Sequence, residues 1–85
     1  MKIKGTVNKY PQQIEVGAEV VVKLGQVLYV NPTKFEVEGA RFAKVVKIEA
    51  IKVRERQVPA RKLTFEDGME ATILTRHKII VKEKA

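Results

Sequence analysis

Apolar side chains occur at every second position through the middle of this 85-residue chain. Val46 and Ile48 alternate with Lys47 and Glu49, so the two kinds of side chain lie on opposite sides of an extended backbone. A helix would repeat its apolar positions about every 3.6 residues, so the spacing predicts a half-buried strand. Residues 41–79 hold most of this alternation and most of the positive charge, and we expect the rest of the chain to be organised around them.

The alternation shifts by one position at Ala50, after which Ile51 and Val53 carry the apolar pattern. Such a shift would turn the apolar side chains outward unless the strand bends, so we expect a bulge or sharp bend at Ala50. Pro59 has no N–H for a central ladder and is expected to end this strand.

The other expected elements are short strands joined by turns. Asp67-Gly68 suits a tight hairpin, because glycine accepts a positive φ without steric cost. We expect no convincing helix; β-branched residues favour a strand over residues 70–78, with a short helix as the alternative. The remaining expected strands cover residues 2–7, 19–22, 26–30, 35–39, 63–65 and 79–81.

This pattern predicts an all-β fold, a small barrel of roughly five to seven short strands with one long bent strand. Residues 1–85 are expected to form one domain, which at this length buries about 60–65% of its unfolded surface. An immunoglobulin sandwich needs about 100 residues and fits less well.

The chain carries 17 Lys and Arg against 10 Asp and Glu, a net charge of +7. Residues 41–62 hold eight basic and two acidic side chains, a balance of +6, whereas residues 10–40 hold two basic and four acidic ones, a balance of −2. Clustered positive charge attracts phosphate, anionic lipid or acidic protein. The alternative is that the charges keep a β-protein soluble and protect its strand edges.

Three positively charged residues at alternate positions, Lys52, Arg54 and Arg56, are the sharpest local feature. Period two would place them on one face of one strand, where the guanidinium forks match phosphate oxygens. A charge-guarded edge strand is the alternative. The further candidates for contact with nucleic acid are Lys44, Lys47, Arg61, Lys62 and Tyr10, whose ring could stack on a base.

The sequence lacks the parts of a catalytic or metal site. It contains no Cys and no Ser, so the common nucleophiles are missing, and His77 is its one histidine. We therefore expect no enzymatic activity, no cofactor and no metal. Residues 1–10 interleave charged and apolar side chains, unlike a signal peptide, and no apolar run approaches the roughly 20 residues of a membrane helix. A cytoplasmic or nucleoid-associated protein is expected.

Several short motifs follow one another in a recognisable order: Gly17 with Val20, Phe42-Ala43-Lys44-Val45, Leu63-Thr64-Phe65 with Asp67-Gly68, then Ile73 and Ile79. Over residues 16–80 this order resembles the Tudor and related SH3-like barrels, and it is similar to small basic archaeal chromatin proteins and KOW-type domains. Two departures are longer segments at 23–41 and 49–62 and the lack of Trp.

The resemblance implies an SH3-like (Tudor-like) barrel and places Phe42 and Phe65, with Tyr29 as a third ring, where such domains hold a methylated ammonium group by cation–π attraction. Burial of the two phenylalanines in the core is the alternative.

We therefore expect a non-enzymatic protein that binds nucleic acid through phosphates, with low sequence specificity. The alternative is a protein-interaction module whose same basic face binds an acidic or methylated peptide, or an acidic transcription or replication partner. A structural protein associated with ribosomes or phage is a third hypothesis. The sequence leaves open DNA or RNA, and single or double strands.

Overall fold

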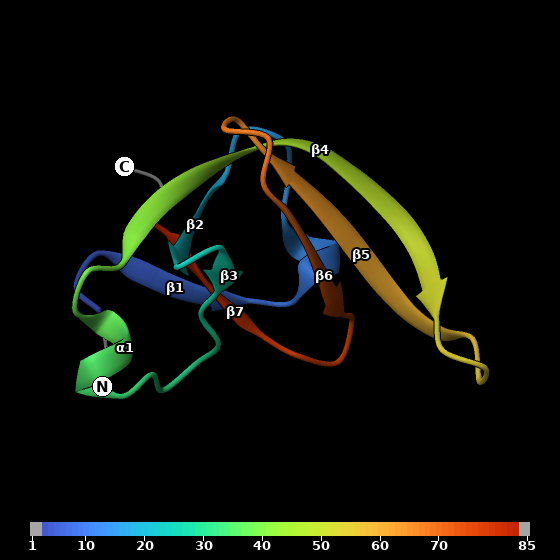
Figure 1. The fold of residues 1–85 in the computed structure, drawn as a ribbon, viewed down its shortest axis with the longest axis horizontal. Coiled ribbons are helices and arrows are strands. Elements are labelled where there is room, and N and C mark those ends of the chain that lie inside the picture. The colour runs from blue at the N-terminus through green and yellow to red at the C-terminus, as the bar shows by residue number, and fades with distance from the viewer. Residues whose placement is uncertain (1–2, 84–85) are drawn as a thin grey trace.

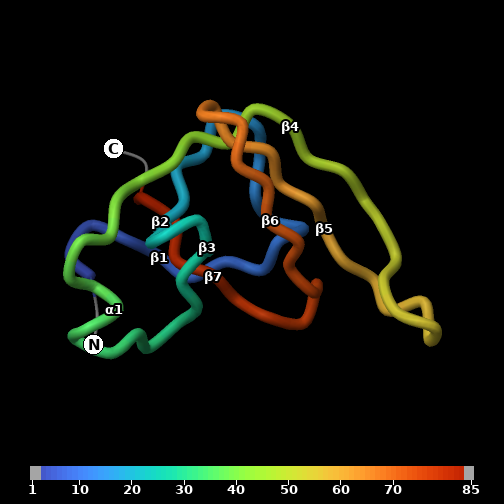
Figure 2. The backbone as a smooth tube through the Cα atoms, in the orientation of Figure 1, coloured from blue at the N-terminus to red at the C-terminus, as the bar shows by residue number. Residues whose placement is uncertain are grey.

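One long strand, β4 (Arg41–Val53), belongs to both halves of a curled antiparallel sheet (Figure 1). Its first residues pair with β2 (Glu19–Lys23) and its later residues pair with β5 (Val58–Phe65). The computed structural model describes residues 3–83. The strand therefore links the two halves, and it extends with β5 as a hairpin away from the rest of the chain (Figure 2).

The sheet has seven strands in the order β1-β7-β2-β4-β5-β6, with β3 paired to β2. All the pairings are antiparallel, so the all-β prediction is confirmed. The remaining elements are β1 (Thr6–Lys9), a 3₁₀ turn η1 (Pro11–Gln13), β3 (Gln26–Val27), α1 (Lys34–Val37), β6 (Glu70–Leu74) and β7 (Ile79–Lys82).

The bulge in β4 lies at Val46, and the predicted bulge at Ala50 is wrong. The register between β4 and β5 shifts between Val45 and Lys47, so Val46 is the extra residue, and it is 46% exposed. From Lys47 to Val53 the pairing with β5 is regular. The bulge lets Val45 and Ile48 face the same side of the sheet although they are an odd number of residues apart.

Because no second bulge follows, Ile51 and Val53 lie on the face opposite Ile48. There Ile51 is paired with Ala60, and Val53 with Val58. Ala60 is fully buried, and the three larger side chains are partly buried. The shifted apolar pattern thus places four paired apolar side chains on this face of the β4–β5 hairpin, and we call them the hairpin cluster.

Pro59 lies inside β5, opposite Lys52. The prediction that Pro59 ends the long strand is therefore wrong, because β4 already ends at Val53. The Pro59 oxygen accepts a hydrogen bond of 3.2 Å from the Thr75 nitrogen. The N and O of one residue point to the same side of an antiparallel ladder, so the missing N–H also faces Thr75. β6 has already ended at Leu74, and the proline therefore removes no bond from within the sheet.

Residues 34–37 form the single helical turn α1, and the predicted strand over 35–39 is wrong. The Thr33 hydroxyl accepts a 3.1 Å hydrogen bond from the Glu36 nitrogen, and the Glu36 carboxylate accepts one of 2.9 Å from the Thr33 nitrogen. The sequence Thr-x-x-Glu predicts this capping box, whereas the alternation of Phe35 and Val37 predicts a strand over the same residues. With Phe35 77% exposed, no buried face supports a strand here.

The other predicted boundaries are partly confirmed. The first strand begins at Thr6, and Lys2, part of the predicted strand 2–7, lies outside the described residues. β3 is shorter than the predicted strand over 26–30. The hairpin at Asp67-Gly68 is confirmed, with Gly68 at a φ of +89°, and residues 70–74 form a strand, as predicted in preference to a helix.

The main core lies inside the curl, and a smaller cluster covers part of the outer face of β2 and β7. Phe65 and Leu63 of β5 are the largest side chains buried in the main core. The other fully buried members of that core are Val20, Val22, Val45, Ile73 and Ile79, and the smaller cluster comprises Val21, Leu28 and Ile80.

We predict that Phe65→Ala lowers the free energy of unfolding by about 3–5 kcal/mol, because it removes a buried ring and leaves a cavity. Phe65 is 1% exposed, whereas Phe42 on β4 is 38% exposed, so Phe42→Ala is the matched control with a smaller loss. Urea unfolding of both variants measures the difference. Equal, small losses would contradict the placement of Phe65 in the core.

Candidate nucleic-acid interface

Arg54 and Arg56 lie in the turn at the end of the β4–β5 hairpin. β4 ends at Val53, and the turn closes with a 3.1 Å hydrogen bond from the Gln57 nitrogen to the Arg54 oxygen. Arg54 has a φ of +66° and Gln57 a φ of +54°, so neither has strand geometry. The prediction that Lys52, Arg54 and Arg56 share one strand face is therefore wrong, because the chain reverses direction within the row.

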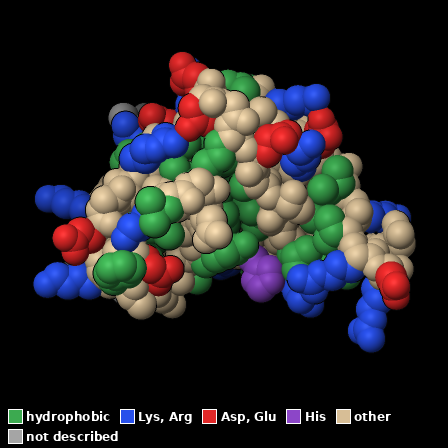
Figure 3. All heavy atoms as spheres, viewed as in Figure 1, with side chains coloured by type: hydrophobic (Ala, Val, Ile, Leu, Met, Phe, Trp, Pro, Cys, Tyr) green, Lys and Arg blue, Asp and Glu red, His purple; other side chains and the backbone are tan. Residues whose placement is uncertain are grey.

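The two arginines share a shallow hollow of about 390 Å³ with Arg76, from the turn between β6 and β7. Glu55 and Val58 complete its lining. Within residues 3–83, no carboxylate lies within 4.0 Å of the three guanidinium groups. Figure 3 shows Lys and Arg side chains gathered at this end of the molecule, at the lower right. We call Arg54, Arg56 and Arg76 the arginine cluster.

Arg76 was missed by the sequence analysis, because only the pairing of β6 with β5 brings its turn beside the hairpin. Arg76 and Lys78 are basic residues at alternate positions, but both are far along the sequence from residues 54–56. No local signal could therefore have joined Arg76 to Arg54 and Arg56.

Lys52 and Arg61 carry positive charge along one face of the hairpin. Lys52 is opposite Pro59, and Arg61 is opposite Ala50, so the two basic side chains are diagonal neighbours on the same face. Among the described residues neither forms an ion pair. Both predicted residues thus present unpaired charge next to the turn that carries Arg54 and Arg56.

Lys47 and Lys62 lie on the other face of the hairpin, and both are ion-paired. Lys47 Nζ lies 2.7 Å from Glu49 Oε1, and this hydrogen bond lowers the pKa of Glu49. Lys62 Nζ lies 3.0 Å from Glu70 Oε2, which raises the pKa of Lys62. Their charge is balanced locally, so the structure does not join them to the arginine cluster.

The last two predicted contacts, Lys44 and Tyr10, do not line the arginine hollow. Lys44 is on the first half of β4, opposite Glu19 of β2. Tyr10 precedes η1, where the Lys78 ammonium lies 5.0 Å from the centre of its ring. Tyr10 is half-buried, so its ring is only partly available for stacking.

The three rings of the predicted cage are not brought together. Phe65 is 1% exposed and faces the main core. Phe42 lies on the outer face of β4, with Lys82 Nζ 5.4 Å from its ring centre. Tyr29 is 45% exposed and makes an edge contact of 5.7 Å, between ring centres, with His77.

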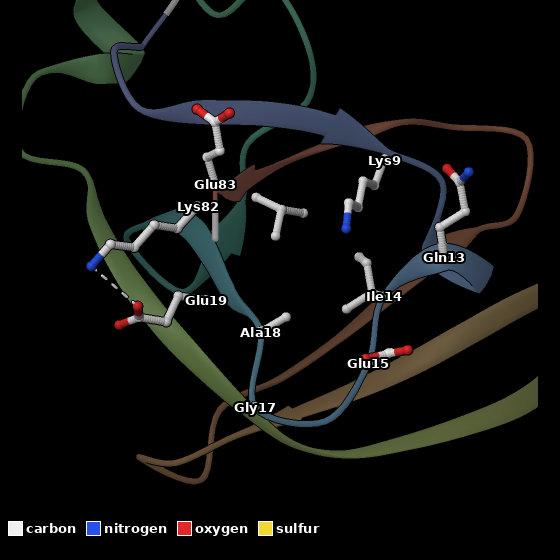
Figure 4. Close-up of a pocket in the computed structure, with 10 residues that line it drawn as sticks. Lys9, Gln13, Ile14, Glu15, Gly17, Ala18, Glu19, Lys82 and Glu83 are labelled. Carbon is white, nitrogen blue, oxygen red and sulfur yellow. Dashed lines mark ion pairs between the residues drawn. The ribbon is translucent and has the colours of Figure 1, made fainter. Parts of the chain in front are cut away.

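Another hollow, of about 540 Å³, lies between the paired strands β1 and β7 and the segment of residues 13–19 that leads into β2 (Figure 4). Ile14 and Ala18 contribute apolar surface between charged groups of both signs. Lys82 Nζ and Glu19 Oε2 are 3.3 Å apart at one side. The mixture of signs gives this hollow no preference for a polyanion, and no group of three His, Cys, Asp or Glu in residues 3–83 could hold a metal ion.

Arg41 is a strand cation that is held by a carboxylate. Arg41 Nη2 lies 2.6 Å from Asp67 Oδ2, and Asp67 Oδ1 accepts a 2.9 Å hydrogen bond from the Met69 nitrogen. The Met69 bond, followed by the Arg41 bond, lowers the pKa of Asp67 below its ordinary value of 3.8. The Asp67-Gly68 turn is thus tied to the first residue of β4.

No protein-family model, curated protein or solved structure gives a significant match to the chain. The resemblance to Tudor and SH3-like barrels stays a prediction from the sequence. No helix in the described part of the chain is long and apolar enough to cross a membrane.

We predict that Asp67→Asn lowers the Tm at neutral pH and that this difference disappears in acid. A lowered pKa in the folded state means that the carboxylate stabilises the fold above its ordinary pKa of 3.8, and that this contribution is lost as the pH falls through the folded value. Asn keeps an acceptor for the Met69 N–H but lacks the charge. Thermal melts of both proteins across this range measure the effect; a constant Tm difference would contradict it.

Proposed function

We propose that the protein binds nucleic acid through phosphate contacts made at the end of the β4–β5 hairpin. The observation that carries this proposal is the convergence of Arg54, Arg56 and Arg76 on one hollow without a carboxylate partner within residues 3–83. A guanidinium group offers a planar fork of donors that fits phosphate oxygens.

The distribution of ion pairs favours this end of the molecule over the basic residues that are paired with carboxylates. Lys47, Lys62 and Arg41 each lie within 3.0 Å of a carboxylate, so a phosphate would have to compete with that carboxylate. The arginine cluster, with Lys52 and Arg61 beside it, has no such competitor among the described residues. The net charge of +7 adds a long-range attraction for any polyanion.

Contacts to phosphates orient a protein on nucleic acid but carry no direct sequence information. The protein is therefore proposed to bind with low sequence specificity and without catalysis. Each neutralised phosphate releases condensed counterions, so the affinity falls as the salt concentration rises.

We predict that Arg54→Asn, Arg56→Ala and Arg76→Ala each flatten the plot of log K against log salt for duplex DNA by about 0.9. Asn is chosen at position 54 because it tolerates the positive φ of that residue better than Ala does. The Tm should change little, since all three side chains are exposed and lie in turns. Fluorescence anisotropy at several salt concentrations measures the slopes.

The control is Lys34→Ala, which removes the same charge from α1, at the end of the molecule opposite the hairpin turn (Figure 1). Its slope should equal that of the wild type. A triple variant of the arginine cluster with an unchanged slope would contradict the proposed interface. Failure of the wild type to bind duplex DNA, single-stranded DNA and RNA would favour an acidic protein partner instead.

A further inference from the structure

Two strands of the sheet, β3 and β6, each have a single partner and border a common gap. Within residues 3–83, β6 pairs only with β5, and β3 pairs only with β2. A hollow of about 390 Å³ is lined by residues 25–27 and Tyr29 on one side and by residues 70–72 on the other. No hydrogen bond joins β3 to β6 in the described part of the chain. The curled sheet is therefore open along this line.

The hydrogen bonds of the β5–β6 ladder show which main-chain groups of β6 face the gap. At the end of this ladder, the Thr75 nitrogen donates to the Pro59 oxygen at 3.2 Å. Bonded and non-bonded pairs alternate along an antiparallel ladder. Counting back through the register, Glu70 and Thr72 fall at non-bonded positions, so their N–H and C=O groups point away from β5.

The same reasoning applies to β3. The Leu28 nitrogen donates to the Val21 oxygen at 3.0 Å, so the adjacent pair, Val22 with Val27, is non-bonded. The N–H and C=O groups of Val27 therefore point away from β2. Val27 also lines the hollow, so main-chain donors and acceptors are present on both sides of the gap.

The β6 edge lacks the features that commonly protect an edge strand. Its sequence, EATIL, has no Lys, no Pro and no bulge, and the carboxylate of Glu70 is paired with Lys62. The second half of β4 is also an edge strand, and it contains the charged residues Lys47, Glu49 and Lys52. Of these two edges, β6 is the one open to pairing with another strand.

We infer that the protein also binds an extended peptide, which adds as a strand to the edge of β6 in the gap beside β3. Main-chain groups at alternate residues match the spacing of a β-strand. A side chain pointing inward would meet Val27 and Ala71, and one pointing outward would lie beside exposed Thr72, so the peptide alternates apolar and polar residues. This site is separate from the arginine cluster.

The surroundings of the gap favour a single peptide over other ligands. β3 bounds the gap on its far side, so a single extended segment would have main-chain groups beside it on both sides. No Lys or Arg among the described residues lines the hollow, which disfavours nucleic acid. A Cβ atom placed on Gly25 would lie 3.9 Å from Met69 Sδ, so the gap narrows at this end, and exposed Tyr29 marks the other.

The probe is an acetylated and amidated hexapeptide of alternating valine and threonine, titrated into the ¹⁵N-labelled protein and followed by NMR. The expected result is that the amide signals of Val27, Glu70 and Thr72 shift and that exchange of the Thr72 N–H slows. The matched control peptide carries methyl groups on its backbone nitrogens, which removes its donors, and should not bind.

The protein variant that tests the same contact is Thr72→Pro, which removes an N–H that β5 does not use. It should lower the affinity for the peptide by about tenfold or more, with Thr72→Val as the control that keeps the affinity. DNA affinity should be unchanged in both variants. Should Thr72→Pro fail to fold, the methylated peptide still decides the outcome.

Three results would overturn the inference: no binding of the parent peptide, equal binding of the methylated peptide, or signal shifts confined to residues away from β3 and β6. Each is independent of the salt-dependence experiment, so this inference and the proposed function can fail separately.

Discussion

The architecture depends on one extra residue in β4. Val46 changes which side chains face inward, so that Ala43 and Val45 before it and Ile48 after it all pack against the main core. Without the bulge, either the first or the second half of the strand would turn its apolar side chains to solvent. The bulge also lets one strand pair first with β2 and then with β5. The curl of the sheet, the composition of the core and the direction of the hairpin therefore follow from a local change in backbone register.

The period-two pattern was sufficient to predict an all-β fold and most of its strands, because alternation is a local property of extended chains. It did not locate the bulge. A shift of apolar residues in the sequence has two physical solutions, a bulge or a second buried face, and at Ala50 the chain uses the second. The pattern also misplaced the effect of Pro59, since whether a missing N–H matters depends on which neighbouring strand it would face.

The candidate site could be predicted only in part. Charge density pointed correctly to Arg54 and Arg56 as exposed cations, but spacing could not reveal that the chain turns between them. Lys47 and Lys62 belong to the same positively charged stretch, yet their carboxylate partners lie on the sheet beside them. Arg76 joins the arginines through tertiary pairing. A local count of charges therefore includes Lys47 and Lys62, whose charges are paired, and leaves out Arg76.

The hairpin cluster of Ile51, Val53, Val58 and Ala60 has a consequence for how the arginine turn meets a ligand. A two-stranded ribbon without packed side chains would sample many orientations, and a ligand would have to select one of them at an entropic cost. Here apolar side chains are paired across the two strands as far as the last pair, Val53 with Val58, and such pairs restrict the motion of the ribbon. The arginines of the proposed interface are thus held on a pre-organised hairpin, so a polyanion bound there would have to adapt its own bending and hydration to them.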